Sequence, residues 1–166
     1  MAFEIEHDEI FKGLRCVVLF TDMGHRCGYV GIGKDHPFYQ KDYSDNVPQD
    51  FITKWHETLQ GTVGKRSPID VLCMVMSPDN PKIGYLFDVH GGITYAGGGK
   101  KYPVDDERWY FGFDCAHCDD APDSEAASEY GFKLSPYRLE RHGTMRSKDY
   151  VIQECHNLAD QLLSIN

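Results

Sequence analysis

Apolar residues gather in short runs along the chain, and most of these runs have the residue types of β-strands. Valine, isoleucine and aromatic side chains fill the runs at 15–21, 27–32, 69–76, 83–89, 93–96 and 108–114. Glycine turns at Asp22–His25 and His90–Gly92 separate neighbouring runs. We therefore expect hairpins and a mainly antiparallel sheet of about five strands.

Two other stretches carry apolar residues at helical spacing. The C-terminal one follows Ser147, a favourable N-cap, and its apolar face consists of Val151, Cys155, Leu158, Ala159 and Leu162. The second predicted helix lies near 49–60, with apolar side chains at Phe51, Ile52, Trp55 and Leu59. Helices packed on an antiparallel sheet give an α+β fold, which we expect as a single domain over 1–166.

The remaining segments are less regular. Residues 3–14 form a short amphipathic segment, and residues 33–48 have turn chemistry throughout, which predicts a long loop. Residues 115–146 are polar and irregular, with one helical turn expected near 124–130.

Charge and composition exclude several classes of protein. The formal net charge is −9, which disfavours binding to a phosphate backbone, so we expect no nucleic-acid partner. No run of about 18 apolar residues occurs, so we expect no membrane-spanning helix. The first residues are acidic where a signal peptide would be basic and then apolar, which predicts a cytoplasmic protein.

Six cysteines would suit three disulfides, but their surroundings favour free thiols. Cys16 and Cys73 lie inside apolar runs, where a thiol acts as a small hydrophobic group. A cytoplasmic chain also keeps its thiols reduced. We therefore expect reduced cysteines.

A metal site is one interpretation of the segment Phe113–Asp120, at the end of the aromatic run. Cys115 and Cys118 have the spacing of a zinc half-site or a redox pair, and His117 and Asp119 complete a candidate ligand set for zinc or another divalent metal. A second half-site is missing from the sequence, so His25, Cys27 or His90 would have to complete a zinc site. Alternatively, Asp114, His117, Asp119 and Asp120 hold a metal that activates water. Adjacent acids are also common in solvated loops and helix caps.

Binding of a small anion is a second interpretation. Gly91 and Gly92 beside His90 allow the backbone to approach a ligand closely, although a hairpin turn also needs glycine. Further candidate ligand-binding residues supply charge or polar contacts: Lys100, Asp114, His117, Arg138 and Arg141. Arg138 and Arg141 belong with Arg146 to a basic run that leads into the predicted C-terminal helix, which is typical of a solvated face but also suits a phosphate. This interpretation requires the bend at 91–92 and the strand end at Asp114 to meet around a shared hollow.

Four strings of the sequence resemble a family of small accessory proteins from tailed phages and prophages. They are Cys27–Tyr39, Asp88–Tyr95, Trp109–His117 and Tyr150–Leu162, and the likeness covers about 25–162. The resemblance implies a soluble protein that acts inside a bacterial cell, which would be the host cytoplasm for a phage-encoded chain. It supplies no activity and no catalytic residue.

Three functions therefore remain open. The first is a small-molecule binding protein for a nucleotide-like anion, with its site near 90–92 and 114–120. The second is a metal-dependent hydrolase that uses Asp114, His117 and His90. The third is a protein–protein inhibitor that presents the acidic segments 105–107 and 119–129 to a basic host protein.

Overall fold

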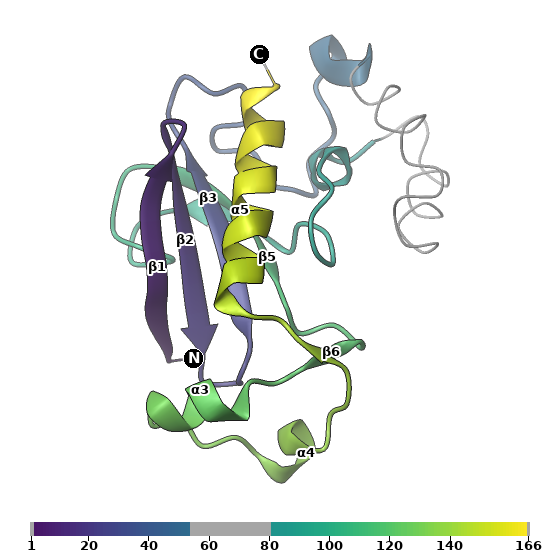
Figure 1. Ribbon diagram of the computed structural model, residues 1–166. Helices are drawn as coiled ribbons and strands as arrows, with labels where there is room; N and C mark the ends of the chain where they lie inside the picture. Colours follow the sequence, from purple (N-terminus) through teal and green to yellow (C-terminus); the bar gives the residue numbers. More distant parts are fainter. Residues whose placement is uncertain (1, 54–80, 166) are drawn as a thin grey trace.

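The computed structural model describes residues 2–53 and 81–165. A five-stranded sheet forms its centre, in the order β1-β2-β3-β5-β4 (Figure 1). The strands are β1 (Phe3–Phe11), β2 (Leu14–Thr21), β3 (Arg26–Ile32), β4 (Tyr95–Gly98) and β5 (Trp109–Asp114). Every neighbouring pair is antiparallel. The predicted α+β fold is thus confirmed.

The C-terminal helix α5 (Lys148–Leu163) lies across one face of this sheet (Figure 1). The Ser147 side chain caps it by accepting a hydrogen bond from the backbone N–H of Tyr150. The five apolar residues predicted to face the core are the buried ones. The close approach depends on Gly28, because a Cβ there would lie 2.7 Å from Sγ of Cys155.

The opposite face of the sheet is covered by a smaller aromatic cluster. Tyr29 and Tyr110 are buried there with Val17, Leu19 and Val104. The segment between β4 and β5 contributes Val104 and Tyr102, so the loop that leaves β4 covers this face. Both faces of the central strands β2 and β3 are therefore buried, as their continuous apolar runs require.

The run at 83–89 was predicted as a strand, and this prediction is wrong. Residues Ile83–Leu86 form a 3-10 helix, η2, and the chain continues through Val89 without pairing to a strand. Its backbone donates to the long loop instead, from Ile83 to the carbonyl of Asp45 and from Gly84 to that of Tyr43. A short buried run has no periodicity that separates these conformations. The turn at 90–92 therefore leads to β4 without forming a hairpin.

Other predicted boundaries also change. Segment 3–14 is an edge strand followed by a turn, and its apolar side chains do not share one buried face, because Ile5 and Ile10 are exposed whereas Phe3 and Phe11 are half-buried. Of the helix expected near 49–60, the structure describes a 3-10 helix, η1 (Gln49–Phe51), and the residues after 53 lie outside the described part. The expected strand at 69–76 also lies outside it. The loop at 33–48 is confirmed, and it places Phe38 in the core.

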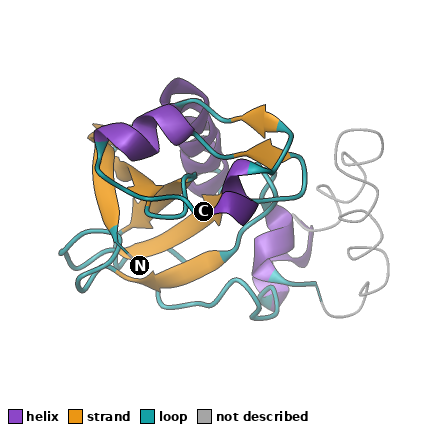
Figure 2. Cartoon of the chain, turned by 90° about the horizontal axis from the view of Figure 1, so that it is seen from below, coloured by secondary structure: helices purple, strands orange, loops and turns teal. Residues whose placement is uncertain are grey.

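Short elements gather at one end of the sheet. They are β6 (Asp120–Ala121), α3 (Ser124–Glu129), α4 (Pro136–Leu139) and β7 (Thr144–Met145). Strands β6 and β7 pair in parallel, and Figure 2, seen from this end, shows them beside the helices. Among the described residues, no helix has the length and apolar character needed to cross a membrane.

Candidate metal centre

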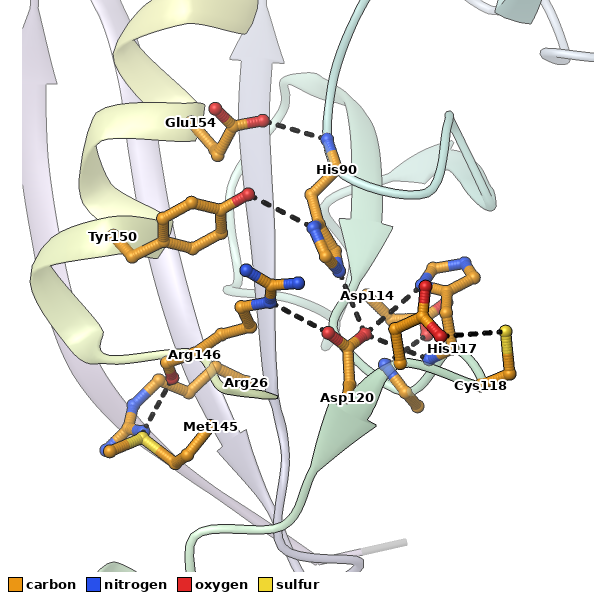
Figure 3. Close-up of polar contacts among 12 residues, drawn as sticks. Arg26, His90, Asp114, His117, Cys118, Asp120, Met145, Arg146, Tyr150 and Glu154 are labelled. Carbon is orange, nitrogen blue, oxygen red and sulfur yellow. Dashed lines mark hydrogen bonds and ion pairs between the residues drawn. The ribbon is translucent and has the colours of Figure 1, made fainter. Parts of the chain in front are cut away.

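Asp120, the first residue of β6, is the centre of a polar cluster beneath the N-terminal end of α5 (Figure 3). Only 2 % of its surface is exposed. Its Oδ2 lies 2.8 Å from Nε2 of His90 and accepts a 3.0 Å bond from the backbone N–H of His117. Its Oδ1 accepts a 2.8 Å bond from Nε of Arg146. Burial raises the pKa of Asp120, but the bonds from Arg146 and His90 outweigh it and leave the pKa lowered, so the group is a carboxylate.

Helix α5 fixes the position of His90. The His90 backbone N–H donates to Oε2 of Glu154 at 2.8 Å, and its Nδ1 lies 3.1 Å from the hydroxyl of Tyr150. Tyr150 and Glu154 are one helical turn apart, so both face the segment that carries His90. Burial raises the pKa of Tyr150, which keeps its hydroxyl protonated at neutral pH. The Nε2 atom of His90 is thereby directed at Asp120.

His117 completes the cluster from the loop after β5. Its Nδ1 lies 3.5 Å from Oδ2 of Asp120. This nitrogen atom is buried and makes no hydrogen bond to any described residue. The ring packs on the turn at Gly91, where a Cβ would lie 1.9 Å from Cε1 of His117. Gly91 also has a φ of +67°. The position therefore needs glycine both for its backbone conformation and for the space that His117 occupies.

The three side chains could hold a metal ion. Nitrogen atoms of His90 and His117 and a carboxylate oxygen of Asp120 lie within 4.8 Å of one another. Three protein ligands with room for a fourth are typical of catalytic zinc sites. The unpaired Nδ1 of His117 fits such a role, because a buried acceptor without a partner is costly. Tyr150 and Arg146 occupy the outer positions that orient ligands in metal sites.

The bend at 91–92 and the end of β5 lie close together, but Asp114 does not line the hollow beside the two glycines, so that hollow is not the shared one that the sequence interpretation required. The Thr94 hydroxyl donates to Oδ2 of Asp114 at 2.8 Å, and the backbone N–H of Ala116 donates to Oδ1 at 3.1 Å. Asp114 thus connects the segment after the bend to the loop that carries His117. Its carboxylate is not one of the three candidate ligands.

The ligand set proposed from the Cys-x-x-Cys spacing does not come together. Cys115 is buried, and burial raises its pKa, whereas Cys118 is exposed with Sγ 3.6 Å from Oδ1 of Asp119. Cys115 continues the register of β5, since its N–H donates to the carbonyl of Arg26, while Cys118 lies in the turn beyond. Within the described residues the group that could hold a metal is His90, His117 and Asp120, which includes His117 of the predicted ligand set but not Cys115, Cys118 or Asp119. The cysteines of the described part are free.

Of the basic candidates, Arg138 and Arg141 line a small hollow together with Asp120, whereas Lys100 lies elsewhere. Lys100 lies past the far end of β4, because Gly98 pairs with Trp109 at the start of β5, away from Asp114. It borders a different hollow of about 480 Å³. Arg138 contacts Sδ of Met23 at 3.2 Å. Arg141 donates to the carbonyls of Ala116 and His117 and so supports the loop beside Asp120.

A hollow of about 320 Å³ borders the turn on another side. Its lining includes Tyr43, Lys82, Asp88, Gly91 and Gly92. The two glycines thus line a cavity, as the anion-binding interpretation expected, although the His90 and His117 side chains do not line it.

Two residues of the cluster, Tyr150 and Glu154, were missed as site residues by the sequence analysis, whereas Arg146 belongs to the arginines at 138–146 that it singled out as a possible anion seat. The only signal for Tyr150 and Glu154 is that they flank the apolar stripe of α5 at its N-terminal end, which is also typical of a solvated helix end. The chain matches no protein-family model, no curated protein and no solved structure.

Proposed function

We propose that the protein is a metal-dependent hydrolase, with a divalent ion, zinc in the first instance, held by Nε2 of His90, Nδ1 of His117 and Oδ2 of Asp120. The observation that carries this proposal is the convergence of these three ligand atoms within 4.8 Å. Two imidazoles and one carboxylate suit zinc, and a bound zinc ion lowers the pKa of its water to about 7. The choice of zinc among divalent ions rests on these ligand types.

The exposure of the cluster supports a reactive role over a purely structural one. The Asp120 side chain is 1 % exposed and that of His90 11 %, whereas that of His117 is 35 % exposed. A metal at this place would thus have protein on one side and solvent access beside His117. Structural zinc sites instead have four protein ligands.

A small-molecule binding protein without turnover is the second candidate. The hollow of about 320 Å³ beside Gly91 and Gly92 favours it, since that volume is at the lower end of ligand pockets. The third idea, an acidic inhibitor of a host protein, has less support. Asp106 and Asp123 lie in the segments that would carry its charge, and both are paired with arginines. Much of that charge is therefore neutralised within the protein.

Zinc titration by calorimetry tests the metal centre. We expect one zinc ion per chain in the wild type and an affinity at least about tenfold lower in His117→Ala, because a direct ligand is lost. His142→Ala is the matched control, since His142 is exposed and lies outside the cluster. Equal zinc affinity in His117→Ala and wild type would refute the centre.

Turnover is measured separately on the zinc-loaded chain with phosphate esters, carboxylic esters and peptides. Hydrolysis of one class that disappears in His117→Ala and persists in His142→Ala is the expected result. Stoichiometric zinc without hydrolysis of any class would refute the hydrolase and favour the binding protein.

A further inference from the structure

Arg146 uses only part of its guanidinium group within the protein. Its Nε donates to Oδ1 of Asp120 at 2.8 Å, and its guanidinium carbon lies 5.2 Å from the ring centre of Tyr150. Neither terminal nitrogen, Nη1 or Nη2, donates to any residue of the described part. Figure 3 shows both on the side of His90 and Tyr150, above the carboxylate of Asp120.

Arg146 is fixed at several points although two of its nitrogens have no partner in the described part. The carbonyl of Arg146 accepts a 3.0 Å bond from Nη1 of Arg26, which is 6 % exposed and ion-paired to Glu6 and Asp123. The Arg146 side chain is itself 23 % exposed. The Arg146 backbone, its Nε and one face of its guanidinium are thus held in place, while Nη1 and Nη2 have no partner in the described part of this partly exposed side chain. A fork of this kind matches the oxygens of a phosphate or carboxylate.

The free donors lie beside the candidate metal ligands. Asp120 joins the two, because its Oδ1 binds Arg146 and its Oδ2 faces His90 and His117. An anion on the fork would therefore contact a metal ion bound to Oδ2. A carboxylate would have to share one of its two oxygens between the fork and the metal. A phosphoryl group can give two oxygens to the fork and a third to the metal, so it suits the arrangement better.

We propose that Nη1 and Nη2 of Arg146 bind the phosphoryl group of the substrate, and that the substrate class is therefore a phosphate ester. This inference rests on the proposed metal centre for the hydrolytic step. In that step the water oxygen forms a bond to phosphorus as the bond from phosphorus to the alcohol oxygen breaks. One water proton ends on the alcohol, and the other remains on the released phosphate.

The test is calorimetric titration of inorganic phosphate into the full chain after metal removal, which isolates the anion site from the metal. Arg146→Lys keeps the positive charge but loses the fork, and Arg146→Gln loses both. We expect the Kd for phosphate to rise at least tenfold in both variants. Lys148→Gln, at an exposed residue two positions away, is the control for net charge and should bind like the wild type. Acetate should bind the wild type at least tenfold more weakly than phosphate.

Unchanged phosphate affinity in a folded Arg146→Lys or Arg146→Gln protein would overturn the inference, and equal binding of acetate would overturn the phosphoryl assignment. Should both variants fail to fold, the Arg146 side-chain NMR signals of the wild type decide, because phosphate must shift them. Zinc titration of the same samples separates the two proposals. Zinc binding without phosphate binding removes only the role of Arg146, whereas phosphate binding without zinc binding supports that role and removes the metal centre.

Discussion

Gly91 sets the distance between the turn at 90–92 and the His117 ring. Its Cα faces the imidazole so closely that any side chain would displace His117. Gly92 has a similar backbone conformation, with a φ of +82°, but a Cβ there meets no atom within 4 Å. A side chain at either glycine would strain the backbone, but only a side chain at Gly91 would also contact His117.

Gly91→Ala should therefore lower zinc affinity at least about tenfold, a loss of the size seen when the support of a ligand is removed. Gly92→Ala should leave the affinity nearly unchanged. Both variants should lose about 1 kcal/mol of unfolding free energy, because alanine is strained at positive φ. Calorimetry and urea denaturation measure the two effects. Equal zinc affinities in the two variants would show that His117 does not depend on Gly91.

Arg15 makes part of the stability depend on pH. It donates to Asp8, and this bond lowers the pKa of Asp8. It also bonds Asp106. Burial raises the pKa of Asp106, but the hydrogen bonds from Tyr110, Arg108 and Arg15 lower it by more, so the pKa is lowered overall. Because both folded pKa values lie below the ordinary value of an aspartate side chain, the unfolded chain takes up protons first as the pH falls.

The stabilisation by Arg15 should therefore be complete near neutral pH and disappear below about pH 4. Arg15→Ala should be less stable than the wild type at pH 7, by about 1 kcal/mol for each pair at most, and the difference should shrink by pH 3. Urea denaturation at both pH values measures it. Lys34→Ala removes the fully exposed pair with Glu107 and should change stability little at either pH. A difference that grows on acidification would contradict the assignment.

At the scale of elements, the packing of α5 on β3 holds the site residues of that helix in place. Gly28 permits this packing, because a Cβ there would also lie 2.4 Å from Cζ of Phe113. Gly33, just beyond β3, has no atom within 4 Å of the corresponding position. Substitutions at Gly28 and Gly33 therefore measure how closely the helix packs on the sheet.

Gly28→Ala should reduce the unfolding free energy by about 1–3 kcal/mol, as expected when a methyl group is forced into a packed core. Gly33→Ala should change it by less than about 0.5 kcal/mol. Chemical denaturation of both proteins measures the difference. A neutral Gly28→Ala would mean that α5 lies further from the sheet than described here.

The sequence predicted those elements whose pattern reflects one buried face. Helix α5 was predicted with its cap and its apolar face, and the pair β2–β3 and the strand β5 were predicted from their runs. The prediction failed at 83–89, whose backbone bonds to the loop at 43–45. That partner is distant in sequence, and no local pattern identifies it.

The same limit applies to the candidate site. His90 and His117 were chosen because glycines and acids surround them in sequence. The contact of Asp120 with Arg146, and that of His90 with Tyr150, depends on how the loop after β5 packs against α5. Cys-x-x-Cys spacing was misleading because Cys115, directly after β5, still bonds to β3 through its backbone and packs its thiol into the core.

At the scale of the whole molecule, Arg26 joins parts of the chain that are far apart in sequence. Its guanidinium binds Glu6 in β1, Asp123 at the cap of α3 and the carbonyl of Arg146 before α5. None of the three contacts is local, and the group that makes them is almost fully buried. Loss of any one would leave a buried charge with incomplete pairing.

Amide hydrogen exchange should therefore reveal β1, α3 and the first turn of α5 as one cooperative opening unit. In Arg26→Lys, which cannot make all three contacts at once, their protection against deuterium uptake should fall together, by about tenfold or more, while β5 remains protected. Independent changes in the three segments would mean that they open separately. If they open together, residues 2–53, which supply no ligand to the candidate centre, would still control how often that centre comes apart.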